Sequence, residues 1–129
     1  MRPHLVNPVV RSILRSRLHG LLSGSLMLMT YTGRVSDRVF TVPVMYARHN
    51  GDLLVYVGHH NAKRWWRNLR GGAPVHVHVR GVDFAGTARI VDGAPELRSD
   101  YLERFPHSRR ALNGDADPVF VEVTNLQPV

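Results

Sequence analysis

The spacing of apolar residues predicts one helix near the start of the chain, followed by short strands. Between Pro8 and Leu22, apolar residues recur at intervals of three and four, with arginine and histidine between them, which is the periodicity of an amphipathic helix. Asn7 offers an N-cap, and Ser23-Gly24 ends the run. The pattern predicts a helix packed outside the main fold. A helix lying on a membrane surface is the alternative, because basic residues flank the apolar stripe.

After Gly24 the period changes to that of β-strands. Runs rich in Val, Phe, Thr and Tyr predict strands over residues 25–32, 38–47, 52–57, 75–80, 84–91 and 119–123. Pro43 predicts that the second strand lies at a sheet edge or beside a bulge. Asn50-Gly51 predicts a two-residue type I′ hairpin turn, because both central positions of that turn need positive φ. Gly81 predicts a second tight turn.

The other segments predict short helices and a loop around a barrel. Lys63–Arg70 suits a short helix ended by Gly71-Gly72, Glu96–Arg104 suits another helix, and Phe105–Pro118 suits a loop. Six mostly antiparallel strands with tight turns suit a small β-barrel, because closure removes exposed sheet edges. The expected fold is therefore mainly β with flanking helices, in a single domain over residues 1–129.

Composition adds an anionic partner to this picture. The chain has 129 residues, is 43% hydrophobic and lacks cysteine, which suits one compact, cytoplasmic domain without disulfides. No apolar run reaches the roughly 20 residues that span a bilayer. The formal charge is +7, and nearly all of the cations are arginine, which pairs bidentately with phosphate and carboxylate. A phosphorylated cofactor, a nucleic acid and an anionic membrane surface all fit this charge.

The loop between the first two strands is a candidate anion site. Arg34 and Arg38 lie four residues apart, Gly33 and Ser36 accompany them, and the loop's backbone amides can face an anion. Two arginines across a turn can close on one phosphate from both sides. An ordinary polar hairpin with solvated arginines is the alternative.

A second candidate segment, Gly58–Arg70, combines cations with two tryptophans. In a helix, Lys63 and Arg67 would share one face, and Trp66 and Arg70 a neighbouring one. Basic groups beside an aromatic face suit a flat, phosphorylated heterocycle. Packing in the core is the alternative for both tryptophans.

Other kinds of site have weaker support. Histidines occur at positions 59, 60, 76 and 78, but without cysteine or a carboxylate at ligand spacing we expect no metal site. The chain also lacks a Gly-x-Ser-x-Gly elbow, a Walker loop and a dinucleotide fingerprint, so hydrolase, nucleotidase and Rossmann functions have no support.

Taken together, the motifs resemble the deazaflavin-dependent nitroreductase and quinone reductase family, in the same order and spacing over about residues 9 to 91. The matching residues are Leu26–Arg34, Arg38, Pro43-Val44, Tyr46, Leu54–Gly58, Lys63–Leu69 and Pro74-Val75. The resemblance implies a six-stranded antiparallel split β-barrel of the pyridoxamine-phosphate oxidase type. It also implies coenzyme F-420, an 8-hydroxy-5-deazaflavin whose polyanionic phosphodiester and oligoglutamate tail would account for the positive charge.

The same resemblance implies an oxidoreductase that passes a hydride from the reduced deazaflavin to a small organic acceptor: a quinone, a nitroaromatic or an activated alkene. The residues expected to hold the cofactor are Thr32, Gly33, Arg34, Ser36, Arg38, Pro43, Lys63, Trp65, Trp66 and Asn68. An FMN- or haem-binding barrel is one alternative, because a fold does not determine its ligand. A non-enzymatic anion- or nucleic-acid-binding module is another, but the chain lacks repeated surface aromatics for stacking bases, so nucleic acid is not favoured. Both a monomer and a homodimer fit.

The anion loop departs from the family pattern Thr-Gly-Arg-Lys-Ser-Gly at two positions. Val35 replaces the lysine and Asp37 replaces the last glycine, and an acid there opposes anion binding. Tyr31 and Tyr46, on the strands flanking the loop, are candidate catalytic donors to the acceptor. A phenol can donate a hydrogen bond while its ring lines an apolar pocket. Plain strand residues are the alternative for both.

Overall fold

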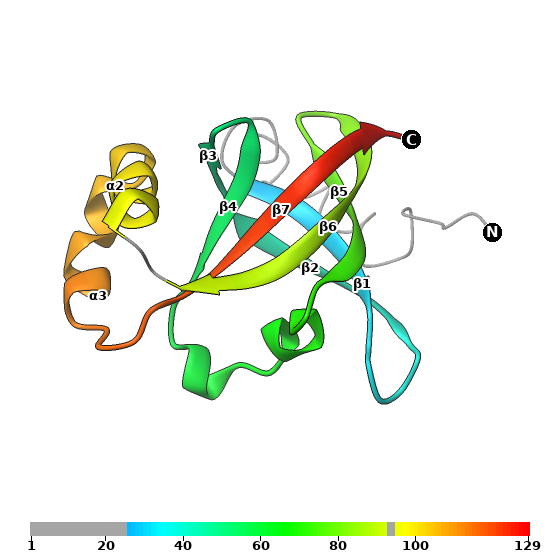
Figure 1. The fold of residues 1–129 in the computed structure, drawn as a ribbon, viewed down its shortest axis with the longest axis horizontal. Coiled ribbons are helices and arrows are strands. Elements are labelled where there is room, and N and C mark those ends of the chain that lie inside the picture. The colour runs from blue at the N-terminus through cyan, green and yellow to red at the C-terminus, as the bar shows by residue number, and fades with distance from the viewer. Residues whose placement is uncertain (1–25, 93–94) are drawn as a thin grey trace.

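A computed structural model describes residues 26–92 and 95–129, which form a curled antiparallel sheet with helices on one side (Figure 1). The strands are β1 (Leu26–Thr32), β2 (Val39–Met45), β3 (Ala47–His49), β4 (Asp52–Val57), β5 (Ala73–Val79), β6 (Val82–Asp92) and β7 (Val119–Pro128). Their order within the described residues is β2-β1-β5-β6-β7-β4-β3. The predicted helix over residues 8–22, with its possible membrane contact, lies outside the described residues.

Both predicted hairpin turns are confirmed. Asn50 and Gly51 have φ values of 52° and 84°, as a type I′ turn requires, and they join β3 to β4. Arg80 and Gly81 have φ values of 52° and 79° and join β5 to β6 in the same way. Positive φ at both central positions matches the right-handed twist of the flanking strands, so these turns set the register of each hairpin.

The expectation of six strands is corrected to seven, because residues 38–47 form two strands instead of one. β2 pairs with β1 as far as Met45, the chain turns at the buried Tyr46, and β3 pairs with β4 from Ala47 onward. A single straight strand cannot pair with both β1 and β4, which occupy different parts of the curled sheet. Pro43 lies on the edge strand β2, which confirms its predicted place.

The predicted helix over Lys63–Arg70 is also corrected. Two 3₁₀ turns, η2 (His60–Ala62) and η3 (Trp65–Leu69), replace it, and Lys63 between them is extended, with φ −114° and ψ 148°. The expected helical face shared by Lys63 and Arg67 therefore does not form. Such short runs commonly adopt 3₁₀ geometry. Gly71 and Gly72, with φ values of 79° and 90°, end the segment as predicted.

The last third of the described chain holds more regular structure than expected. Helix α2 (Pro95–Arg104) confirms the predicted helix. The predicted loop over 105–118 instead contains the 3₁₀ turn η4 (Pro106–Ser108) and the short helix α3 (Arg109–Asn113). β7 continues to Pro128, beyond the predicted end at residue 123, because its pairing with β6 resumes after a bulge between Ala85 and Thr87.

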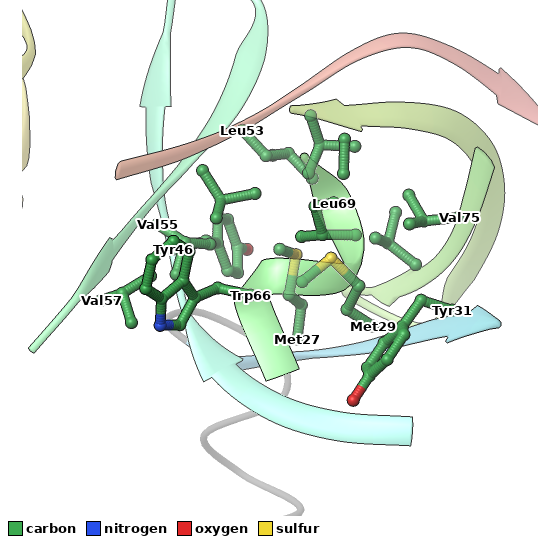
Figure 2. Packing of buried hydrophobic residues seen from close by; sticks show 14 of the residues in the cluster. Met27, Met29, Tyr31, Tyr46, Leu53, Val55, Val57, Trp66, Leu69 and Val75 are labelled. Carbon is green, nitrogen blue, oxygen red and sulfur yellow. The ribbon is translucent and has the colours of Figure 1, made fainter. Parts of the chain in front are cut away.

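Alternate side chains of the strands fill the inside of the curled sheet. Met27 and Met29 of β1 point toward Leu69 and Trp66 of η3 (Figure 2), and all four side chains are buried. A second cluster lies where α2 and α3 cover β3, β4 and β7, with Tyr101, Leu112 and Phe120 buried at its centre. These two clusters fix η3 on one side of β4 and α2 on the other.

We expect Gly86→Ala to destabilise the fold. A Cβ at Gly86 would lie 2.9 Å from the backbone oxygen of Thr124 and 3.1 Å from the Leu126 side chain. Overpacking of this kind costs about 1–3 kcal/mol. Urea unfolding should show a lower midpoint with an unchanged m-value.

Gly114→Ala is the matched control, because its Cβ would come no closer than 3.4 Å to another atom. Its free energy of unfolding should stay within about 0.5 kcal/mol of the parent. Equal midpoints for the two variants would show that the contact between β6 and β7 at Gly86 tolerates a methyl group.

Candidate functional site

A groove of about 520 Å³ runs between β2 and β4. Its lining residues are Val42–Met45, Val55–Gly58, Lys63, Trp65 and Tyr101. Ligand pockets for drug-sized molecules usually span about 300–1,000 Å³ and combine apolar walls with a few polar groups. This β2–β4 groove has that size and composition.

Both long walls of the groove are strand edges. β2 pairs only with β1 within residues 26–92 and 95–129. On β4, pairing with β3 covers Asp52 to Leu54 and stops there, so Val55 to Val57 pair on one side only, with β7. Unpaired strand edges present backbone N–H and C=O groups. The groove therefore offers backbone donors and acceptors along both walls.

A row of three aromatic rings connects the groove to the β1–β2 hairpin. The Tyr31 ring stacks on Phe40 with a centroid distance of 5.6 Å and an interplanar angle of 27°. On its other side it lies 6.4 Å from the Trp65 ring, which lines the groove. Tyr31 thus lies between the Trp65 ring and the Phe40 ring of the β1–β2 hairpin.

The anion loop, residues 33–38, is a tight and internally bonded turn. Gly33 N–H donates to Arg38 O at 2.8 Å, and Asp37 N–H donates to Gly33 O at 3.1 Å. Arg38 N–H donates to Ser36 Oγ at 3.2 Å. A Cβ at Gly33 would lie 2.8 Å from Ser36 Oγ and 3.0 Å from the Phe40 ring, so a larger residue at this position would require those two side chains to move.

Asp37 is left-handed, with a φ of 59°. Glycine adopts this conformation without cost, and aspartate is among the few other residues that tolerate it. The geometry thus explains why Asp can stand where the resembled family has glycine. The Asp37 carboxylate lies between Arg34 and Arg38 in the sequence of the loop.

Asn68 ties the anion loop to the groove. Its Oδ1 accepts a hydrogen bond from Arg34 N–H at 2.9 Å, although 34 residues separate the two. Its Nδ2 donates to Trp65 O at 3.0 Å. One side-chain amide therefore fixes the position of the basic loop relative to the tryptophan in the groove.

The predicted cofactor residues divide into two groups in the structure. Pro43, Lys63 and Trp65 line the groove itself. Thr32, Gly33, Arg34, Ser36 and Arg38 belong to the hairpin that Asn68 holds beside η3. Lys63 and the two loop arginines are exposed, and the Arg38 guanidinium lies 5.9 Å from the Phe40 ring centroid.

Trp66 and the two candidate tyrosines do not line the groove. Trp66 is packed in the core, and its Nε1–H donates to His60 O at 2.9 Å. The guanidinium of Arg67 lies 5.5 Å from the centre of the Trp66 ring. Tyr46 is buried at the corner between β2 and β3. Tyr31 stands one ring behind Trp65, and burial raises the pKa of its phenol, so it stays protonated near neutral pH.

Sequence reasoning missed Tyr56 and Tyr101, which both line the groove. Burial raises the pKa of Tyr101 to about 12. Burial first, and then its hydrogen bond to Asp115, raise the pKa of Tyr56 above its ordinary value. Tyr56 is an ordinary residue of strand β4 in the sequence. Only the packing of α2 against β4 brings Tyr101 to it, with ring centroids 5.8 Å apart.

No group of three or more His, Cys, Asp or Glu side chains in residues 26–92 and 95–129 is arranged to hold a metal ion. In the same ranges no helix has both the length and the apolar character needed to cross a membrane.

Comparison with known proteins identifies the family. A family model described as "F420H(2)-dependent quinone reductase" matches residues 9–123, which is most of the 129-residue chain. The chain belongs to this family of oxidoreductases, and coenzyme F-420 is the cofactor on which the family depends. No curated protein matches the chain.

Solved structures confirm the split-barrel fold. An "F420-H2 Dependent Reductase (FDR-A)" has a TM-score of 0.65 and 22% identity, covering 78% of this chain and 95% of that one. A protein described as a "domain-swapped dimer" has a TM-score of 0.65 and 21% identity, covering 90% and 93%. HutZ, a heme storage protein from Vibrio cholerae, has a TM-score of 0.53 and 13% identity, covering 99% and 95%.

We expect Asp37→Asn to strengthen binding of coenzyme F-420. The substitution removes a negative charge from the anion loop, and asparagine tolerates the left-handed backbone. An exposed charge pair contributes about 0.2–1 kcal/mol, so affinity should rise by up to about fivefold. Titration at low salt measures the dissociation constant.

Asp37→Gly removes the charge and also relieves the left-handed backbone, because Asp37 has a φ of 59°. Comparing it with Asp37→Asn separates the effect of charge from the effect of backbone conformation. Asp37→Gly should bind at least as tightly as Asp37→Asn. Asp52→Asn is the matched control, since Asp52 lies at the start of β4 outside the groove lining. Equal affinity in the parent and both Asp37 variants would show that the loop does not face the anion.

Proposed function

We propose that the β2–β4 groove binds the ring system of reduced coenzyme F-420 and that the protein reduces a quinone placed beside it. The observation that carries this proposal is the tether at Asn68, which couples a basic loop to an aromatic, open-edged groove of about 520 Å³. A flat heterocycle with an anionic tail needs both features, one for each half of the molecule.

In this proposal, the groove residues Pro43 and Trp65 contact the ring, and the open edges of β2 and β4 hydrogen-bond its polar rim. Lys63, at the groove, and Arg34 and Arg38, on the anion loop, bind the phosphate and carboxylates of the tail. The hydroxyls of Ser36 and Thr32 add hydrogen-bond donors, and Gly33, whose N–H donates to Arg38 O, shapes the loop around the tail. Planar guanidinium groups suit such bidentate recognition.

The bound cofactor supplies a hydride, so the protein needs no nucleophile of its own. The chain's task is to hold the acceptor in line with the cofactor ring and to exclude water, which are positioning effects. Tyr31 lies next to Trp65, and burial raises the pKa of its phenol, so it keeps its proton. Of the two candidate tyrosines, Tyr31 and Tyr46, it is the better placed for donating to the acceptor. Tyr46 would act only through the packing of the corner. Nitroaromatics and activated alkenes are further acceptors in the proposal.

The test of the reaction is rapid mixing of the protein, loaded with reduced F-420, with menadione. Menadione should be reduced in one two-electron step without a radical signal, and NADPH without F-420 should give no turnover. A one-electron radical signal, or turnover with NADPH alone, would contradict hydride transfer from a bound deazaflavin.

The double variant Arg34→Ala/Lys63→Ala should bind F-420 more weakly at low salt. Two exposed ion pairs contribute about 0.4–2 kcal/mol together, which corresponds to a roughly two- to thirtyfold rise in the dissociation constant. Added salt should shrink the difference, because it screens exposed charges.

Arg109→Ala/Arg110→Ala is the matched control for this variant. It removes the same formal charge from α3, and neither residue lines the groove. Unchanged affinity of the Arg34→Ala/Lys63→Ala variant at low salt, or an equal loss in both double variants, would place the anion elsewhere.

A further inference from the structure

A second hollow, of about 330 Å³, adjoins the β2–β4 groove. The two cavities share Tyr56 and Gly58 in their linings, so they meet at the end of β4. His60 of η2 and Asp115, just after α3, line the second hollow with Tyr56. We refer to this space, lined by residues 56, 58–62, 111, 114 and 115, as the histidine hollow.

Three titratable side chains of the histidine hollow form a connected group. The Tyr56 hydroxyl donates to Asp115 Oδ2 at 2.8 Å. His60 Nδ1 lies 3.8 Å from the same oxygen, and the two side chains are only 13% and 15% exposed. The other carboxylate oxygen, Oδ1, accepts from Asp117 N–H at 3.2 Å. Asp115 is thus held from two sides and faces the imidazole with its Oδ2 atom.

The imidazole of His60 is fixed in place but incompletely hydrogen-bonded. Its ring lies edge-on to Trp66, at 5.9 Å and 79°, and its backbone oxygen accepts from Trp66 Nε1–H. Nδ1 is enclosed and makes no hydrogen bond within residues 26–92 and 95–129. Buried polar atoms are nearly always paired, so an exception in a rigid setting calls for an explanation.

We propose that His60 is the proton donor for the reduced acceptor, with Asp115 and Tyr56 as positioning residues. This inference rests on the proposed function. A quinone becomes a hydroquinone by gaining a hydride and a proton. The reduced cofactor supplies the hydride with its two electrons. The Nε2–H bond of the protonated His60 ring breaks as an O–H bond forms on the acceptor oxygen. Nδ1 keeps its proton toward Asp115, and the neutral ring then regains a proton on Nε2 from solvent.

Each member of the group has a distinct part in this step. Asp115 faces Nδ1 and orients the ring, as carboxylates do for histidines in general acid–base catalysis. Tyr56 holds Asp115 in place, and its own proton is committed to that carboxylate. Tyr101 and Arg98 of α2 also act on Tyr56. Burial first, and then Asp115 and Tyr101, raise the pKa of Tyr56, and Arg98 lowers it. His60 is therefore the group with a proton to give.

The arrangement of the pair can be measured in the cofactor-free protein. Because Nδ1 faces Asp115, the neutral imidazole should carry its proton on Nδ1, which ¹⁵N chemical shifts of the ring report directly. Asp115→Asn should change the balance of the two tautomers. A parent protein with the proton on Nε2, and no change in Asp115→Asn, would overturn the proposed pairing.

Single-turnover reduction of menadione by reduced F-420 tests the catalytic role. His60→Gln should slow the step by about 10²- to 10⁴-fold, the usual contribution of a positioned acid, while the dissociation constant for F-420 stays within about twofold. His60→Ala should also be slow. Added imidazole should partly restore its rate, because the removed side chain leaves space for it at the hollow. His107→Gln, an exposed histidine of η4, should react at the parent rate.

The outcomes separate this inference from the proposed function. A parent protein that binds F-420 but does not reduce menadione would refute the proposed function, and the proton-donor role with it. A parent protein that reduces menadione while His60→Gln keeps the full rate would refute the donor role alone. A large loss in Tyr56→Phe with a normal rate in His60→Gln would assign the proton to Tyr56 instead.

Discussion

The corner at Tyr46 is the constraint on which the rest of the structure depends. There the chain stops pairing with β1 and, one residue later, begins to pair with β4. The change of partner curls the sheet and leaves β2 and the end of β4 each with one unpaired edge among the described residues. The groove exists because those two edges face each other without pairing. Tyr46 is buried at the corner, so its packing resists a slip of either strand.

Local sequence signals predicted most of the fold because they act over a few residues. The Asn50-Gly51 turn needs two positive φ angles, which few other dipeptides supply, and the structure has both. Pro43 predicted a sheet edge or a bulge, and it lies on the edge strand β2. By contrast, the corner at Tyr46 lies within an unbroken apolar run, so nothing in the local pattern marks a change of partner. The same holds for β7, whose length depends on β6 across a bulge.

The candidate site was predictable in part for a similar reason. Arg34, Arg38 and Lys63 stand out as cations in motifs, and the resemblance of those motifs to a known family indicated the cofactor. Asn68 was included in that set, but its bond to the backbone of Arg34 depends on tertiary structure. The group in the histidine hollow could not be predicted, because Tyr56 and Asp115 are 59 residues apart and meet only through α3.

In the proposed function, the groove and its tethered loop select a deazaflavin with an anionic tail. The most direct measurement is a side-by-side equilibrium titration of the purified protein with coenzyme F-420 and with FMN at low salt. We expect saturable binding of F-420 with one molecule per chain, weakened by salt, and markedly weaker binding of FMN. Equal or tighter binding of FMN, or no saturable binding of F-420, would contradict this expectation.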